Sequence, residues 1–242
     1  MTAAPIIEFR GVEKALGETV PLRITAFTLH AHERVVLGGL PGARGEALMN
    51  LVTGATVPDA GDVIVFGRNT KEIRTDTEWL ASLDRFGLVS NRAVLLDQST
   101  IAQNLALPLT LSIDPIPADV RATVDRLARQ VGLSLEVLDA APADEGQGGV
   151  MQRARMHLAR AIAHDPEALL LEHPTSTFSG VPSGAFGATV RLIVDDRQLS
   201  LFAVSEDDQF ARATGGRRFR VERDGTVRPA GSAWRRFFGW GG

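Results

Sequence analysis

Two kinds of segment alternate along this chain: short apolar runs, and stretches in which hydrophobic residues recur with helical spacing. The clearest run is Ala168–Leu171, which is continuously apolar and has the length of a strand buried on both faces of a sheet. Another short apolar strand, Arg34–Leu37, leads into a turn rich in glycine and proline. Further strands are expected at Ile6–Phe9, Arg23–Leu29, Val63–Phe66, Gly87–Val89, Leu201–Val204 and Phe219–Val221.

Helices are expected between these strands. The helix that Gly146–Gly149 opens places Val150, Ala154 and Leu158 on one face, and Pro117 suits the first turn of a helix that ends near Val131. Strands that alternate with helices predict an α/β fold with a largely parallel sheet. The expected helical stretches are Glu46–Thr53, Ile101–Gly132, Gly146–His164, Gly184–Asp195 and Asp207–Ala213.

Composition narrows the class of protein. The 242 residues are 44% hydrophobic and 23% charged, which is ordinary for a globular domain and excludes a disordered, collagenous or coiled-coil chain. Since there is no cysteine, disulfides, cysteine metal sites and thiol catalysis are excluded. No apolar run approaches the ~18–20 residues of a membrane-spanning helix, and the start MTAAPIIEF lacks the pattern of a signal peptide.

Charge is distributed unevenly along the chain. The net charge is −3, yet the segment from Gln209 to the end holds eight arginines and two acidic residues. Only two lysines occur, Lys14 and Lys71. The scarcity of lysine limits which phosphate-binding motifs the chain can carry.

Five segments, in order along the chain, resemble the ATP-binding subunits of ABC transporters. Glu33–Gly54 resembles the strand, phosphate loop and first helix of that family, and Leu95–Leu109 resembles the segment after its glutamine loop. Arg153–Thr177 resembles the long helix that leads into a buried strand, an acidic pair and a proline. Val204–Ala213 resembles the histidine-switch region, and Asp224–Val227 resembles the last hairpin.

The resemblance implies an α/β P-loop NTPase core of the ABC ATPase type, with an N-terminal antiparallel β region and an inserted helical lobe. Residues 1–90 and 154–228 would form the core, 91–153 the lobe with a signature-like motif, and 229–242 a basic and aromatic tail. The run ALPL, residues 106–109, is similar to the lipid- and lipoprotein-transport branch. The structural alternative is an unrelated α/β domain with a chance glycine-rich turn.

The phosphate loop departs from the pattern of the family. A working loop reads G-x-x-x-x-G-K-[ST], and its lysine and hydroxyl serve the phosphates and Mg²⁺. Here Arg44 replaces the second glycine, Gly45 the lysine and Glu46 the hydroxyl, and no lysine exists between Lys14 and Lys71. The positions that match the family's phosphate-binding residues are Gly39, Gly42, Arg44, Gly45, Glu46 and Ala47.

The other motifs also lack residues that bind or hydrolyse the nucleotide in the family. Leu16 stands at the adenine-stacking aromatic, Asn91 at the glutamine, and Glu206 at the switch histidine. Gln147 replaces the serine of the signature sequence, which keeps Gly148 and Gly149 as further candidate nucleotide-binding positions. At the catalytic acidic pair stand Glu172 and His173, and Ser179 replaces the aspartate of the following loop.

Two of these residues allow a functional or a structural interpretation. Arg44 has the geometry to bind a phosphate, or it is a surface arginine on a tight turn. His173 is a competent general base in principle, or it is a hydrogen-bonded structural histidine. Together the replacements remove most of the electrostatic stabilisation on which phosphoryl transfer depends, so Glu172, His173 and Glu206 are expected to be inactive equivalents of catalytic residues.

Three hypotheses for function follow. The first is a degenerate ABC subunit, a pseudo-ATPase with a structural or regulatory role beside a membrane permease subunit. The second is an active ATPase with Arg44, Glu172 and His173 as substitutes, and the third is a binding module detached from transport. The resemblance implies Mg-ATP as the family's ligand, although these departures argue against its binding, and no metal ligand set is expected.

The resemblance also implies partners and a location. A permease subunit and a second ATP-binding subunit, as homodimer or heterodimer, are expected, with no nucleic acid, on the cytoplasmic face of the cell membrane. The permease is expected to dock near Asn91 and Ile113–Pro117, whereas Leu95, Leu96 and Leu105 are expected in the core.

The C-terminal segment Ser232–Gly242 combines aromatic residues with two arginines, a composition that suits a membrane surface or a protein partner. The alternative is that this tail folds back onto the core.

Overall fold

The structure is a computed structural model that describes residues 4–17, 19–90, 92–143 and 146–230. Its strands are β1 (Pro5–Leu16), β2 (Thr19–His30), β3 (Arg34–Gly38), β4 (Ala60–Val65), β5 (Arg68–Asn69), β6 (Phe86–Ser90), β7 (Ala168–Glu172), β8 (Ser200–Val204), β9 (Arg217–Val221) and β10 (Val227–Pro229). Its α-helices are α1 (Ala43–Val52), α2 (Asp76–Leu83), α3 (Ile101–Ala106), α4 (Ala118–Gln130), α5 (Gly146–Ala161), α6 (Ser183–Asp196) and α7 (Asp208–Ala213). Short 3₁₀ turns lie at Thr70–Glu72 and Leu135–Val137.

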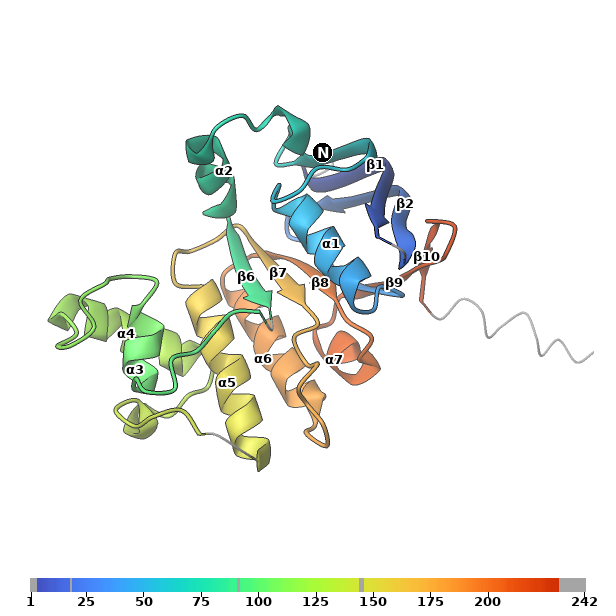
Figure 1. Ribbon diagram of the computed structural model, residues 1–242. Coiled ribbons are helices and arrows are strands. Elements are labelled where there is room, and N and C mark those ends of the chain that lie inside the picture. The colour runs from blue at the N-terminus through green and yellow to red at the C-terminus, as the bar shows by residue number, and fades with distance from the viewer. Residues whose placement is uncertain (1–3, 18, 91, 144–145, 231–242) are drawn as a thin grey trace, which may run out of the picture.

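The strands form two sheets. The larger sheet has the order β10-β9-β3-β8-β7-β6, and every pair from β9 to β6 is parallel. The smaller sheet has the order β2-β1-β4-β5 and is antiparallel. Helix α1 and the smaller sheet cover one face of the larger sheet, while α5, α6 and α7 cover the other, with α3 and α4 beside α5 (Figure 1).

The central strands are buried on both faces, because successive side chains point to opposite sides of a sheet. In β8, Phe202 and Val204 join the cluster that contains α1 and the smaller sheet. Leu201 and Ala203 join the cluster that contains α3 to α7. The same alternation in β7 explains why Ala168–Leu171 is apolar without interruption. The predicted α/β architecture with an N-terminal antiparallel region is confirmed.

Several local expectations differ from the structure. Helix α2 was not expected, although Thr75 caps it by accepting a hydrogen bond from the Glu78 N–H at 3.2 Å. Pro117 is the residue before α4 rather than part of its first turn. The prediction that Leu96 lies in the core is wrong, since it is 42% exposed, whereas Leu95 and Leu105 are buried as expected.

Within the described residues, none of the helices is both long and apolar enough to cross a bilayer. The predicted tail segment Ser232–Gly242 lies outside the described residues.

We expect Phe202→Ala to lower the free energy of unfolding by about 3–5 kcal/mol, because truncating a buried aromatic leaves a cavity. Phe202 is fully buried, and its ring lies 6.1 Å from that of Phe9 and 6.3 Å from that of Phe27, across the contact between the two sheets. Urea denaturation measures the loss, with Leu192→Ala on the exposed side of α6 as the control. A loss no larger than that of the control would contradict this account.

Candidate functional site

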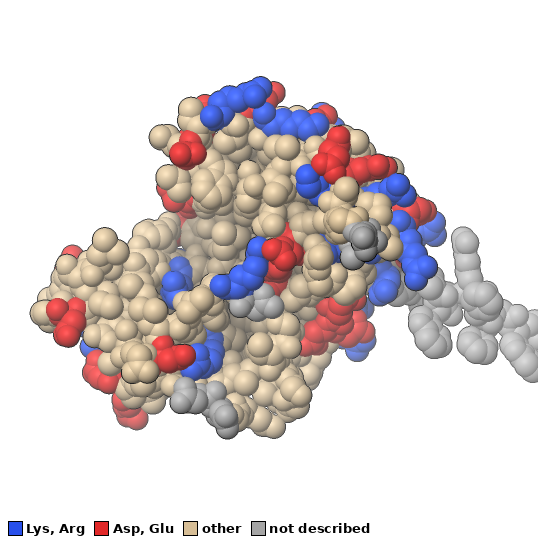
Figure 2. Space-filling view, in the orientation of Figure 1, with Lys and Arg blue, Asp and Glu red and all other residues tan. Residues whose placement is uncertain are grey.

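The predicted site lies at one edge of the larger sheet. Strands β3, β8, β7 and β6 are neighbours and run parallel, so the loops that follow them meet at their carboxyl ends. Ligands of open α/β sheets bind at this edge. Acidic and basic side chains lie side by side at the centre of the face shown in Figure 2. The topology therefore brings together most of the residues that the sequence placed in a site.

The backbone N–H groups in the first turn of α1 are hydrogen-bonded to carbonyl oxygens of the preceding loop. A phosphate at a helix N-terminus needs N–H groups without intrahelical partners. The N–H groups of Arg44, Gly45 and Glu46 instead donate to the carbonyl oxygens of Pro41 and Gly42 at 3.0–3.4 Å. Their hydrogen bonds close the loop on itself, which leaves these three donors unavailable to an anion.

Arg44 folds back onto the same loop. Its Nη1 donates to the Gly39 carbonyl at 3.0 Å, while its Nε and Nη2 are buried and lack a hydrogen-bond partner among the residues described. Burial lowers the pKa of the Arg44 guanidinium, and the charge of Glu206 opposes that change. Arg44 therefore helps to hold the loop closed.

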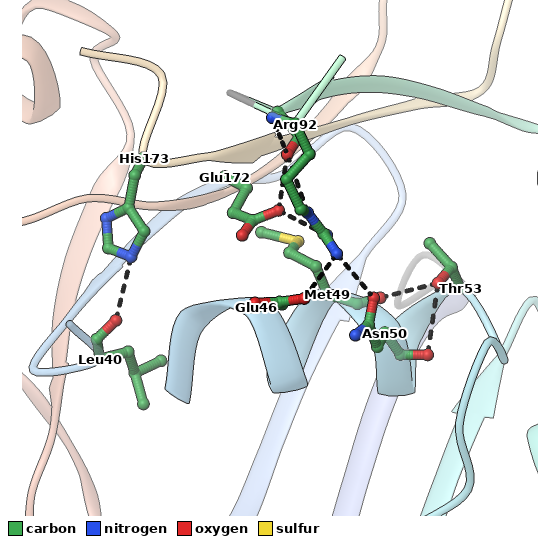
Figure 3. A network of polar contacts seen from close by, with 9 residues as sticks. Leu40, Glu46, Met49, Asn50, Thr53, Arg92, Glu172 and His173 are labelled. Carbon is green, nitrogen blue, oxygen red and sulfur yellow. Dashed lines mark hydrogen bonds and ion pairs between the residues drawn. The ribbon is translucent and has the colours of Figure 1, made fainter. Parts of the chain in front are cut away.

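The peptide groups of Leu40, in the middle of the loop, are bonded from two sides. The Leu40 N–H donates to Glu206 Oε1 at 2.9 Å. The Leu40 carbonyl lies 3.1 Å from His173 Nε2 (Figure 3). Because the partner is a carbonyl oxygen, Nε2 carries the hydrogen and donates it, so this nitrogen cannot also take a proton from water.

Gly45 faces the same imidazole. A Cβ built on Gly45 would lie 2.5 Å from His173 Nε2 and 2.9 Å from the Leu40 carbonyl oxygen. Both separations are shorter than real Cβ contacts allow. A lysine at this position would therefore displace the histidine ring.

Arg92, which the sequence analysis missed, connects three elements of the site. Its Nη1 donates to Glu46 Oε1 on α1 at 2.9 Å, and its Nη2 donates to Glu172 Oε2 at the end of β7 at 2.7 Å. The hydroxyl of Ser90, at the end of β6, donates to the same Glu172 oxygen at 2.9 Å. Figure 3 shows the guanidinium between the two carboxylates. The only signal in the sequence is its position directly after Asn91.

Two hollows flank these contacts. One, of about 500 Å³, is lined by Pro41, Gly42, His173 and Glu206 among others. The other, of about 230 Å³, is lined by Arg92, Glu172 and Trp79 among others.

The remaining predicted site residues lie elsewhere or are not described. Leu16 ends β1 and is partly buried against the cluster between the sheets, and Ala47 is buried in α1. Gln147 donates to the Gly180 carbonyl at 3.0 Å from the first turn of α5, which also contains Gly148 and Gly149. Asn91 lies outside the described residues.

The residues present do not fit a magnesium nucleotide. The two carboxylates at the metal-facing positions, Glu46 and Glu172, are already paired with one guanidinium. The position of the lysine is closed by His173. In the described part of the chain, no three histidine or acidic side chains are grouped so that they could hold a metal ion.

His157 is a further titratable group near the site that the sequence analysis missed. It lines a hollow of about 180 Å³ together with Ser90 and His173. Burial, together with the nearby charges of Arg160 and Arg153, lowers the pKa of His157 to about 4. This histidine is therefore neutral in the folded protein at neutral pH.

We expect Gly45→Ala to destabilise the fold by about 1–3 kcal/mol, because the added methyl overlaps the His173 ring. The cost should be smaller in a His173→Ala background, which gives a positive coupling in a double-mutant cycle measured by chemical denaturation. Gly148→Ala is the control, since a Cβ there meets nothing within 4 Å. Equal costs for Gly45→Ala in both backgrounds would refute the proposed steric conflict.

Acid should destabilise the protein partly through His157. Its folded pKa of about 4 is below the ordinary value of 6.5, so the unfolded state binds the proton more readily. The associated stability is present above pH 6.5 and is lost as the pH falls toward 4. Allowing for partial exposure, His157→Gln should remove ~1–2 kcal/mol of the decrease in unfolding free energy between about pH 7 and 5.

The same pH series on His164→Gln, an exposed histidine near the end of α5, provides the comparison. An unchanged pH dependence in His157→Gln would mean that other groups cause the acid sensitivity.

Comparison with known proteins gives the family. Residues 22–176 match the family model described as ABC transporter. The methionine import ATP-binding protein MetN 2 of Paraburkholderia xenovorans is 32% identical over 239 residues, which cover 96% of this chain and 60% of that protein. The phosphonates import ATP-binding protein PhnC of Frankia casuarinae is 30% identical over 203 residues, covering 81% and 78%. The chain thus spans about three fifths of the length of the MetN relatives.

Solved structures agree in fold. The ATP-binding cassette MJ0796, in a dimeric post-hydrolysis state with ADP and Pi, matches with a TM-score of 0.70 at 21% identity, covering 92% of this chain and 96% of that one. The protein CbiO1 of Clostridium perfringens, part of an ABC transporter complex, matches with a TM-score of 0.72 at 16% identity, covering 92% and 86%. The chain therefore belongs to the ABC transporter family and has the fold of its ATP-binding domain.

Proposed function

We propose that this chain is an ATP-binding-type subunit of an import system and acts there as a structural or regulatory partner without hydrolysing ATP. Its relatives are named as import proteins for methionine, phosphonates and Fe(3+) ions, which supports the transport role. None of these names points to a lipid cargo, so the similarity of residues 106–109 to the lipid-transport branch gains no support.

The hydrogen bonding of Leu40 carries the proposal. The residues at the positions of the catalytic base and the switch histidine, His173 and Glu206, bond the carbonyl and the N–H of Leu40. Both residues thereby hold the loop in a closed form. A nucleotide would have to break these bonds before its phosphates could approach the loop.

Electrostatics support the same conclusion. Phosphoryl transfer depends on positive charge placed around the phosphates. At this edge Glu46 and Glu206 bring carboxylates to positions where the family has a hydroxyl and a histidine, and Gly45 brings no charge. The carboxylate of Glu206 occupies a loop N–H that would otherwise be free for an anion.

The surroundings of the site support a role in a complex. We propose that residues 91–153 form the lobe next to the core and that a permease subunit docks beside it, on the cytoplasmic face of the membrane. Val94 and Leu96 are 72% and 42% exposed, and Leu111 is 94% exposed, so apolar side chains are available there. The partner in the pair of ATP-binding subunits would be a second copy or an active relative.

An active ATPase with atypical residues is the second candidate, and the names of the import relatives favour it. It would need Arg44, Glu172 and His173 to serve the nucleotide, although all three are engaged within the protein. A binding module detached from transport is the third candidate, and co-purification with a membrane subunit would exclude it.

We expect no binding of Mg-ATP tighter than ~100 µM in calorimetry, and no phosphate release, because the loop is closed and lacks its lysine. Methionine import protein MetN 2 of Paraburkholderia xenovorans, titrated under the same conditions, is the positive control. Micromolar affinity, or ATP turnover that Glu172→Gln abolishes, would establish the active ATPase instead.

A further inference from the structure

A single guanidinium, that of Arg92, lies between the carboxylates of Glu46 and Glu172. Arg92 lies among four side-chain oxygens from three elements: Glu172 at 2.7 Å, Glu46 at 2.9 Å, Ser90 at 3.3 Å and Asn50 at 3.5 Å. Carboxylates, hydroxyls and amide oxygens are the ligands that hard divalent cations prefer. The chain thus surrounds one of its own cations with oxygen atoms of the kind that hard cations prefer.

The buried carboxylate makes this cation necessary. Glu172 is 6% exposed, so leaving its charge without a partner in the protein interior would be strongly destabilising. Arg92 Nη2 and the Ser90 hydroxyl both donate to Glu172 Oε2. The outer contact, with Glu46, is about half exposed and adds less, because water screens it.

The hydrogen-bond geometry connects the elements around the site. Arg92 follows β6, Glu172 ends β7, and Glu46 lies in the first turn of α1. A guanidinium presents its donors in a fixed planar arrangement, so it sets the positions of both carboxylates at once. A metal ion could arrange them in a similar way only while it was bound.

We propose that Arg92 is a built-in cation that replaces a divalent metal between Glu46 and Glu172. It keeps α1, β6 and β7 in one arrangement irrespective of nucleotide and metal. This inference rests on the proposed function, because an arginine at the metal position belongs to a subunit whose site does not turn over. It predicts that removing the arginine opens a cation site that the natural protein lacks.

Trp79 provides a local reporter of cation binding. It lines the hollow of about 230 Å³ together with Asn50, Arg92 and Glu172. Its indole N–H donates to the Thr53 carbonyl at 2.9 Å, which fixes the ring there. A terbium ion bound to the carboxylates would be sensitised by this indole, and Tb³⁺ prefers the same hard oxygen ligands as Ca²⁺.

The test titrates Tb³⁺ into the full chain and records luminescence excited through tryptophan. The natural protein should give no saturable signal that depends on Trp79. In Arg92→Ala and Arg92→Gln, the dissociation constant for Tb³⁺ should be at least about tenfold lower than any value that the natural protein gives. The reason is that a positive charge is removed from between two carboxylates. Adding Trp79→Phe should remove the signal, and adding Glu172→Gln should weaken the binding itself.

Arg121→Ala is the matched control. Arg121 also bridges two carboxylates, those of Asp125 and Asp139, but on α4 and its neighbourhood, away from the candidate site. It should show no gain of a Trp79-dependent signal. A second readout is thermal: Mg²⁺ or Ca²⁺ should raise the melting temperature of the Arg92 variants and leave that of the natural protein unchanged.

Three results would overturn the inference. One is a folded Arg92 variant that binds no Tb³⁺, and another is an equal gain in Arg121→Ala. The third needs no Arg92 variant: a Trp79-dependent signal in the natural protein that Glu172→Gln removes would show that a metal already binds there. These results are distinct from micromolar Mg-ATP binding by the natural protein, which would overturn the proposed function.

Discussion

The register of three parallel strands determines what this site can be. Leu37, the next-to-last residue of β3, and Glu172, the last of β7, both pair with Val204, the last residue of β8. The residues that follow these strands must therefore meet, whatever their chemistry. In an active member of the family this junction is expected to hold a nucleotide. Here it places His173 and Glu206 against the two peptide groups of Leu40.

The charged and hydrogen-bonding groups at that edge are paired with other groups of the same chain. Glu206 accepts from a loop N–H, Arg92 lies between two carboxylates, and Arg44 caps a loop carbonyl. Each contact satisfies a group that a ligand would satisfy in a binding site. Since a buried charge without a partner is costly, these pairs within the chain stabilise the edge of the sheet. Gly45, Glu46 and Glu206 are therefore consistent with one another, because each suits the group that it faces in the fold.

The sequence predicted the elements whose positions depend on burial of apolar side chains. It did not predict the ion pairs between residues that are far apart in the chain. Strand β7 and helix α5 could be predicted because their apolar spacing is determined by the core. Helix α2 was missed because it is short and contains no buried residue. The pairs of Arg92 with Glu46 and Glu172 join residues 46 and 80 positions apart, a distance over which side-chain pairing leaves no periodic signal.

Most of the core lies apart from the candidate site, so the interiors of the strands and helices do not depend on which polar side chains stand at the edge where the loops meet. The two apolar clusters are built mainly from strand and helix interiors, such as Phe202 and Leu169, although Leu40 of the loop belongs to one of them. Most of the replaced motif positions lie in loops or first turns. Gly45, in the first turn of α1, is buried, and it faces the ring of His173. A lysine in place of Gly45 would conflict sterically with the present packing, so the residue at this position and the orientation of His173 toward the loop depend on each other.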